Sequence, residues 1–267
     1  MAKVKSVRAL ERGLQVLERV REAESASLND LHLHTGLSRA TLLRALKTLE
    51  LDGWIQAAHD GAAYRLGPKM FGSTTFSSRH RTLADLAVPV LQELGKKVTW
   101  PSDVAICRGG CMVILESSRR HSPFVINRNA VGRRPSMLKS AMGRAYLAFC
   151  PAEERERLLE RLRRSTNPDD KSAGVTSLVQ QILRDTRERG YGVREPGYWA
   201  AADDYGGDVS SIAVPVVVGV QVAASISLLW VAGTSSVEDF ARAHLGALRE
   251  AAAMLARSIE EQRSRAR

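Results

Sequence analysis

The side chains best suited to bind another molecule lie on one face of a short segment, residues 38–51. At about 100° per residue, the apolar side chains of a helix here would gather on one side, away from a cationic and hydroxyl-bearing set. That set is Ala40, Thr41, Arg44, Lys47 and Thr48. Arginine can donate two hydrogen bonds to guanine, and threonine can approach a thymine methyl group or a phosphate. Such a face suits the major groove of duplex DNA.

The residues around this segment decide between DNA binding and an ordinary solvated helix face, which also commonly carries Arg and Lys. Ser38 is expected to cap the helix, and with Arg39 it would meet the phosphate backbone, which the helix dipole attracts. A short helix over 28–34 is expected before it, capped by Ser27 with Asp30 in the capping-box position. Gly36 would supply the turn between the two helices.

A hairpin is predicted after the third helix, because two short extended runs flank Asp60-Gly61. Its Tyr64 or Arg65 would lie along the DNA backbone or the adjacent minor groove. With an amphipathic helix over 4–22 in front, the predicted order is helix, helix, turn, helix, hairpin. That order is typical of a winged helix-turn-helix, and duplex operator DNA is the expected partner.

The rest of the chain predicts a second, larger domain that mixes helices with an antiparallel sheet. We place the DNA-binding domain at 1–68, a Ser/Thr-rich linker at 69–80 and the second domain at 81–267. Strands are expected over 104–106, 112–116, 123–127, 210–218 and 221–230. Helices are expected over 83–97, 140–149, 153–164, 175–189 and 237–263. The fold class is therefore α+β.

Composition limits the function classes. The net charge is +10, and it is spread over both domains, so it supports a polyanionic partner without locating one. No apolar stretch is long enough for a membrane span. Cys107, Cys111 and Cys150 cannot all pair, which favours a reducing cytoplasm. These cysteines lack nearby partners for a metal site, and no phosphate loop or nucleophile elbow is present. We therefore expect no enzyme, no metal and no cofactor.

Several stretches resemble the isocitrate-lyase-regulator (IclR) family of transcription factors, and they extend over almost the whole chain. They are VRALERGL (7–14), GLSRAT (36–41), VGRR (131–134), SAMGRA (140–145), GYG (190–192) and SIAVP (211–215). WPSD (100–103) and LAFCP (147–151) are similar to the subgroup that regulates 3-(3-hydroxyphenyl)propionate catabolism. The resemblance implies a GAF-like effector-binding domain, homodimers or homotetramers on DNA, and regulation by a small, often aromatic, carboxylic acid.

The resemblance also implies where the effector would bind. The matching positions are Phe124, Asn127, Pro135, Ala141, Met142 and Ser211, with Ser225 and Ser227 on the last strand. These two serines stand two residues apart and so share a face, but the sequence leaves open which one points into the pocket. Trp100 would favour a flat ligand, Arg128 could pair with a carboxylate, and Asp203 is an imperfect match to an acidic position of some relatives. Ordinary core packing is an equal alternative for each residue alone.

The expected function is therefore a ligand-responsive regulator that senses a carboxylic acid, controls a catabolic operon as activator or repressor, and contacts RNA polymerase. Two alternatives stay open: a regulator of a different metabolite, and a DNA-binding repressor that needs no ligand.

Overall fold

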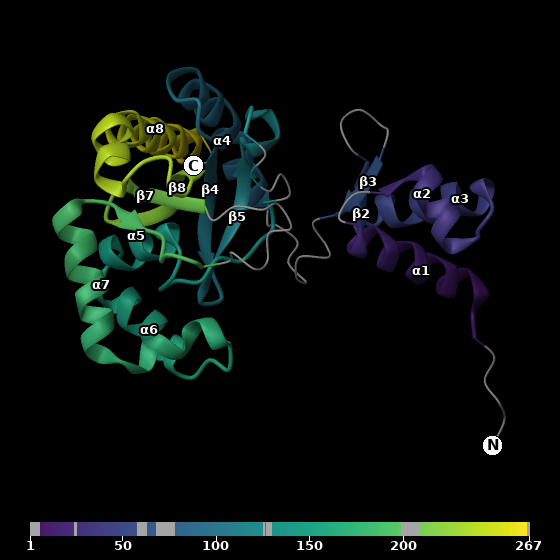
Figure 1. Ribbon diagram of the computed structural model, residues 1–267, viewed down its shortest axis with the longest axis horizontal. Coiled ribbons are helices and arrows are strands. Elements are labelled where there is room, and N and C mark those ends of the chain that lie inside the picture. Colours follow the sequence, from purple (N-terminus) through teal and green to yellow (C-terminus); the bar gives the residue numbers. More distant parts are fainter. Residues whose placement is uncertain are drawn as a thin grey trace. The chain divides into compact units, whose positions relative to one another are not determined.

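The computed structural model describes residues 6–23, 26–57, 63–67, 78–124, 126, 130–198 and 209–265. Its contacts divide the chain into two compact units, Met1–Ser77 and Ser78–Arg267 (Figure 1). Each unit has its own hydrophobic core, and each is described here by itself.

The described residues of the N-terminal unit form three helices and a small sheet. The helices are α1 (Arg8–Glu22), α2 (Leu28–Thr35) and α3 (Arg39–Leu51). The strands are β1 (Ala26–Ser27), β2 (Ile55–Ala57) and β3 (Ala63–Leu66), in the antiparallel order β1-β3-β2. The predicted hairpin is thus part of a three-stranded sheet, because β1 pairs with β3. The predicted Asp60-Gly61 turn lies outside the described residues.

Capping side chains set the ends of the two helices of the helix-turn-helix, as the sequence predicted. The Ser27 side chain accepts a hydrogen bond from the Asp30 amide, and the Asp30 carboxylate accepts one from the Ser27 amide at 3.0 Å. Gly36 ends α2 at φ 66°, a left-handed conformation that glycine adopts without a steric penalty. Ser38 then caps α3 by accepting from the Thr41 amide. These local bonds fix the angle at which α3 leaves the turn.

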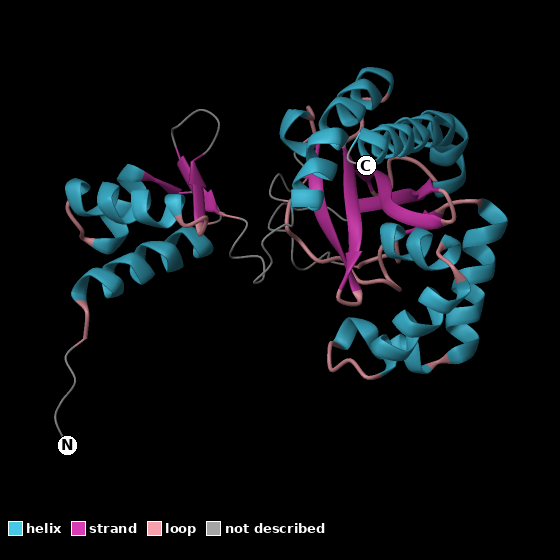
Figure 2. Cartoon of the chain, turned by 180° about the vertical axis from the view of Figure 1, so that it is seen from behind, coloured by secondary structure: helices cyan, strands magenta, loops and turns pink. Residues whose placement is uncertain are grey.

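The C-terminal unit is an antiparallel sheet with helices on both faces (Figure 2). The strand order is β5-β4-β8-β7-β6. The strands are β4 (Ser102–Arg108), β5 (Cys111–Ser117), β6 (Gly192–Val193), β7 (Val209–Val218) and β8 (Gln221–Val231). The helices are α4 (Ser78–Lys97), α5 (Ala141–Phe149), α6 (Ala152–Arg163), α7 (Thr176–Arg189) and α8 (Val237–Arg265). The described part of the unit also contains the 3₁₀ turns η2 (Arg119–His121) and η3 (Pro168–Gly174).

Alternation along β8 shows which helices cover which face of the sheet. The Ser225 hydroxyl donates to the carbonyl of Met142 in α5, so Ser225 and Ser227 face α5. Trp230 has the opposite parity and stacks on Phe240 of α8 with ring centroids 3.8 Å apart. Helix α4 packs against α8 and against β4 and β5. The sheet therefore separates an α5 face from an α4/α8 face.

The structure contradicts the predicted strand over 123–127. Pro123 and Phe124 lie in bends, and so does Ile126; residues 125 and 127 are outside the described residues. The Phe124 amide donates to the Ser122 hydroxyl at 3.2 Å, and the Ile126 amide donates to the Phe124 carbonyl at 3.0 Å. These short-range bonds curl the segment, and Pro123 has no amide hydrogen to give to a neighbouring strand.

Candidate DNA-contacting surface and effector site

Helix α3 presents the predicted DNA-contacting side chains to solvent. Leu42 and Leu46 are buried in the core of the unit, at 0% and 1% exposure. The opposite face carries the predicted set. Thr41 is half-buried. The other members are exposed: Ser38, Arg39, Ala40, Arg44, Lys47 and Thr48. Within the described residues no carboxylate pairs with Arg44, whereas Lys47 lies 3.4 Å from Glu50. The guanidinium of Arg44 is thus available to an outside partner.

Leu43 is an exposed residue of α3 that the sequence analysis passed over. It is 48% exposed and lies one turn from both Arg39 and Lys47. An apolar side chain at this place can contact a thymine methyl group. The spacing of four residues from Arg39 and from Lys47 places Leu43 on the same face of the helix as these two residues. This spacing could have indicated that Leu43 is exposed, but leucine is ordinarily assigned to the core.

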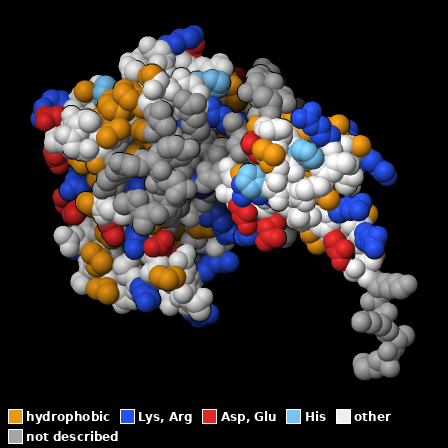
Figure 3. Space-filling model, turned by 45° about the vertical axis from the view of Figure 1, so that its right-hand side comes forward, with side chains coloured by type: hydrophobic (Ala, Val, Ile, Leu, Met, Phe, Trp, Pro, Cys, Tyr) orange, Lys and Arg blue, Asp and Glu red, His pale blue; other side chains and the backbone are white. Residues whose placement is uncertain are grey.

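Of the predicted wing residues, Tyr64 is half-buried and packs against the core of the unit. Arg65 lies opposite Gln56 in the β2–β3 ladder, and its side chain is outside the described set. In the view of Figure 3, Lys and Arg side chains stand out along the outer margin of the N-terminal unit.

Helix α1 leaves an apolar stripe uncovered. Val7, Leu10 and Leu14 are 64%, 61% and 54% exposed. They stand three and four residues apart, so they lie on one face of the segment. Beside them a cavity of about 750 Å³ opens between α1 and α3, and Arg44 and Trp54 also line it. A stripe of this kind is typical of a surface that meets another protein chain.

On the α5 face of the sheet, the hydroxyl groups of the two predicted serines, Ser225 and Ser227, differ in their hydrogen bonding. Both are buried, at 0% and 1% exposure for Ser225 and Ser227. Ser225 donates to the Met142 carbonyl at 3.1 Å. Ser227 has no hydrogen-bond partner for its hydroxyl among the described residues. Because a buried unpaired hydroxyl is costly, Ser227 is the serine with capacity left for a ligand.

A buried ion pair lies directly beside Ser227. Asp103 on β4 is the cross-strand neighbour of Ser227, so the two side chains share the α5 face. Arg119 binds the Asp103 carboxylate through two hydrogen bonds, Nε to Oδ1 at 3.0 Å and Nη2 to Oδ2 at 2.6 Å, and Ser117 donates to the same carboxylate. This cluster was not predicted from the sequence. Asp103 is a charged residue within an otherwise uncharged stretch, 102–106. A charged residue in a buried strand is usually paired, so this position could have indicated the cluster.

Apolar side chains lie on the same face of the sheet as this polar group, and a second buried arginine, whose guanidinium donates to the Tyr198 carbonyl, follows β6. Leu229 and Val209 form a small core cluster with Ile126, and Phe124 packs against it. Arg194, at 9% exposure, follows β6 and donates its amide hydrogen to the Ser211 carbonyl at 3.0 Å. The α5 face therefore brings together a buried hydroxyl, an ion pair and apolar side chains.

The other predicted effector residues divide into three groups. Pro135, Ala141, Met142 and Ser211 are buried at or near α5 and β7. Asn127, Arg128 and Asp203 lie outside the described residues. Trp100 stacks on Phe124 with centroids 4.2 Å apart, but it also lines a separate groove beside α4.

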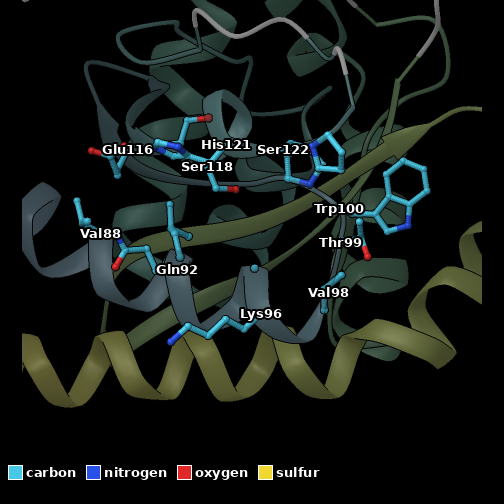
Figure 4. Close-up of a pocket in the computed structure, with 15 residues that line it drawn as sticks. Val88, Gln92, Lys96, Val98, Thr99, Trp100, Glu116, Ser118, His121 and Ser122 are labelled. Atoms are coloured by element: carbon cyan, nitrogen blue, oxygen red, sulfur yellow. Dashed lines mark hydrogen bonds between the residues drawn. The ribbon is translucent and has the colours of Figure 1, made fainter. Parts of the chain in front are cut away.

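That groove runs between α4 and the end of β5 (Figure 4). Glu116 lies at one end and Trp100 at the other, with Ser118, His121 and Ser122 along one wall. Val88 and Gln92 of α4 form part of the other wall. Of the predicted effector residues that the structure describes, Trp100 alone lines it.

Two of the cysteines, Cys107 and Cys150, have thiols that burial keeps protonated near neutral pH. Burial raises the pKa of Cys107 to about 12, and the nearby Glu154 carboxylate adds to the shift. Burial likewise raises the pKa of Cys150 to about 11. Among the described residues, no group of three or more Cys, His, Asp or Glu side chains could hold a metal ion.

Alkylation should reveal these raised pKa values. At pH 8, a thiol at its ordinary pKa of 9.0 is about one-tenth thiolate. We therefore expect iodoacetamide to modify Cys107 about 1000-fold more slowly in the native protein than in urea. Mass spectrometry of digests at timed intervals measures both rates. Equal rates in the two states would contradict the burial of this thiol.

Sequence profiles of known families match both units. The helix-turn-helix domain of IclR matches residues 9–58, and the C-terminal domain of the bacterial transcriptional regulator IclR matches residues 76–259. The chain belongs to the IclR family. It is accordingly an IclR-type DNA-binding transcriptional regulator, with an N-terminal helix-turn-helix and a C-terminal effector-binding domain.

Characterised IclR-family relatives are transcriptional regulators. The HTH-type transcriptional regulator XynR of Escherichia coli is 28% identical over 69% of this chain and 73% of its own length. TsaQ1/TsaQ2 of Comamonas testosteroni is 27% identical, over 79% of this chain and 73% of that protein.

Solved IclR structures share the fold. The IclR protein of Thermotoga maritima superposes with a TM-score of 0.59 at 20% identity, covering 94% of this chain and 98% of that one. An IclR homologue from Microbacterium hydrocarbonoxydans, solved with 4-hydroxybenzoate, gives 0.55 at 24% identity, covering 95% and 99%. Of the helices described here, none is long and apolar enough to cross a membrane.

Proposed function

We propose that this IclR-family regulator senses a small carboxylic acid with a flat, aromatic body, and controls in the cytoplasm an operon that degrades it. The likeness of 100–103 and 147–151 to regulators of 3-(3-hydroxyphenyl)propionate catabolism makes arylpropionates the first acids to try. The homologue solved with 4-hydroxybenzoate indicates that this fold accommodates a ligand of that class.

The unpaired Ser227 hydroxyl is the observation that carries this proposal. It is 1% exposed and has no partner among the described residues. Leaving such a group unpaired costs about 1–3 kcal/mol, which a ligand oxygen would offset. Leu229 follows two positions along the same face, and its cluster with Phe124 would take the aromatic ring. Asp103 neutralises the Arg119 guanidinium beside Ser227, so we propose a carboxylate from the resemblance to regulators of aromatic-acid catabolism and not from local charge.

The proposed mechanism couples this site to DNA through association of chains. Two chains would pair through the exposed stripe of α1, so that their α3 helices reach half-sites one or more helical turns apart. Two such dimers would make a homotetramer. An effector bound between the sheet and α5 would favour the arrangement of the chains that binds it more tightly. DNA affinity, or contact with RNA polymerase, would then change by an amount that the difference between the effector's affinities for the two arrangements limits.

A thermal-shift titration tests the effector class. A ligand at 100 times its dissociation constant stabilises the native state by about 2.7 kcal/mol, so a binding arylpropionate should raise the melting temperature clearly. We expect Ser227→Ala to weaken binding at least about 10-fold, because hydrogen bonds to charged groups contribute about 1.5–3 kcal/mol.

The matched control is Ser210→Ala on β7. Ser210 is the cross-strand neighbour of Trp230, so it faces α8 and should not alter the response. A panel of aromatic and aliphatic acids that leaves the melting temperature unchanged would favour a ligand-independent repressor. A response that survives Ser227→Ala would remove Ser227 from the site, and a response to aliphatic acids alone would point to a different metabolite.

A further inference from the structure

The groove beside α4 lies on the opposite face of the sheet from the effector site. Ser117 is the cross-strand neighbour of Asp103 and faces α5, whereas Glu116 is the neighbour of Val104 and faces α4. Gln92 and Val88 approach from α4 on the other wall (Figure 4). Ser117, which donates to Asp103, also borders the groove, so the groove adjoins the Ser227 cluster at this residue, while its Glu116 carboxylate lies on the other face of the sheet from Ser227.

Its size and floor suit one small molecule. The cavity measures about 410 Å³, within the roughly 300–1,000 Å³ of ligand pockets. The apolar floor consists of Leu91 and Val98, which are 3% and 4% exposed, together with Pro101. Trp100 closes one end. A flat or chain-like apolar body would fill this part.

Among the described lining residues, Glu116 is the carboxylate of the groove, and it is incompletely satisfied. One Glu116 oxygen accepts a hydrogen bond from the amide of its own neighbour, Ser117, at 2.8 Å. The other charged side chain in the lining, Lys96, is paired with Glu93 at 2.5 Å. Burial raises the pKa of Glu116, although Arg120 and His121 act in the opposite direction. A carboxylate that has lost solvation gains from a cation that donates hydrogen bonds.

We propose that this groove is a second small-molecule site, and that its ligand is an organic amine. The ammonium group would bind Glu116, with Gln92 and His121 as further hydrogen-bonding groups. The apolar body would lie on Leu91 and Val98 and reach Trp100. This chemistry is opposite in charge to that of the acid proposed for the Ser227 site, so the two sites would respond to different metabolites.

Calorimetry on the full chain with three probes of similar shape tests the proposal. The probes are 2-phenylethylamine, 2-phenylethanol and 3-phenylpropionate. We expect the amine to bind at least 10-fold more tightly than the alcohol, and Glu116→Gln to remove that difference. Amine affinity should rise with pH as Glu116 ionises, because the carboxylate must be charged to attract the ammonium. The control is Asp85→Asn, an exposed acid of α4 that does not line the groove.

A second variant fills the groove without touching the carboxylate. Gly95 lines the groove within α4, and a Cβ there would meet nothing within 4 Å. Gly95→Leu should therefore fold at least as stably as the parent chain, since leucine favours helix over glycine, and should weaken amine binding at least 10-fold. Gly174→Leu, at a site outside the groove that is equally open to a Cβ, should leave it unchanged.

The outcomes separate the two sites. Amine binding that Glu116→Gln and Gly95→Leu both weaken, and that Ser227→Ala does not, supports the second site whether or not any acid binds. Equal affinity for the amine and the alcohol, or no amine binding by the parent chain at millimolar concentration, overturns it. Amine binding that is lost only in Ser227→Ala would assign the amine to the α5 face and likewise overturn it.

Discussion

Arg44→Ala is expected to remove most of the preference of this regulator for its operator over random DNA. Arg44 is exposed at the centre of the α3 face, and within the described residues no carboxylate competes for its guanidinium. A bidentate arginine–guanine pair provides about 1–3 kcal/mol of discrimination, or about 5- to 150-fold. Competition binding with the operator and with shuffled DNA, at one fixed salt concentration, measures the ratio.

Arg39→Ala is the comparison that separates base reading from attraction to phosphate. Arg39 stands at the first turn of α3, where the helix terminus favours the DNA backbone. Its removal should weaken binding to operator and random DNA alike, and should reduce the slope of log affinity against log salt by about 0.9. If Arg44→Ala behaved in the same uniform way, Arg44 would be a phosphate contact and not a base-reading residue.

Gly143→Ala is expected to destabilise the C-terminal unit by about 3 kcal/mol or more, an overpacking effect at the upper end of the usual range. Gly143 lies inside α5, and a Cβ there would stand 2.4 Å from the Met137 Cα and 2.5 Å from the Met137 carbonyl oxygen. Both are backbone atoms, so no side-chain rotation can relieve the contact. Alanine is favoured over glycine in helices by about 1 kcal/mol, which is too little to offset the clash.

Gly246→Ala in α8 is the matched control for this effect. A Cβ at Gly246 would meet no atom within 4 Å, so only helix propensity acts, and stability should rise by about 0.5–1 kcal/mol. Urea denaturation of both variants measures the difference. A Gly143→Ala variant as stable as the parent chain would show that α5 does not pack tightly on the Met137 segment, and it would weaken the placement of the effector site beneath α5.

Local side-chain chemistry made the helix-turn-helix predictable from the sequence. The Ser27–Asp30 capping box, the left-handed Gly36 and the Ser38 cap each involve atoms within three residues. The buried spacing of Leu42 and Leu46 fixed which face of α3 turns outward.

The effector site was harder to predict because its members are distant in the sequence. Ser227 and Asp103 become neighbours only when β4 pairs with β8. The sequence placed Ser225 and Ser227 on one face, but only the fold showed that Met142 uses the hydroxyl of Ser225 and leaves that of Ser227 unpaired. Trp100, which the sequence placed among the effector residues, stacks on Phe124 but also lines the groove beside α4.

The sequence by itself determined the family, the order of most elements and the outward face of α3, because helix caps and hydrophobic periodicity act over a few residues. Tertiary structure alone decided which buried polar groups meet. The Asp103–Arg119 pair beside Ser227, and the separation of Glu116 from Ser117 onto opposite faces, depend on strand register. Register is set by long-range pairing, and a shift of one residue would exchange the two faces of a strand.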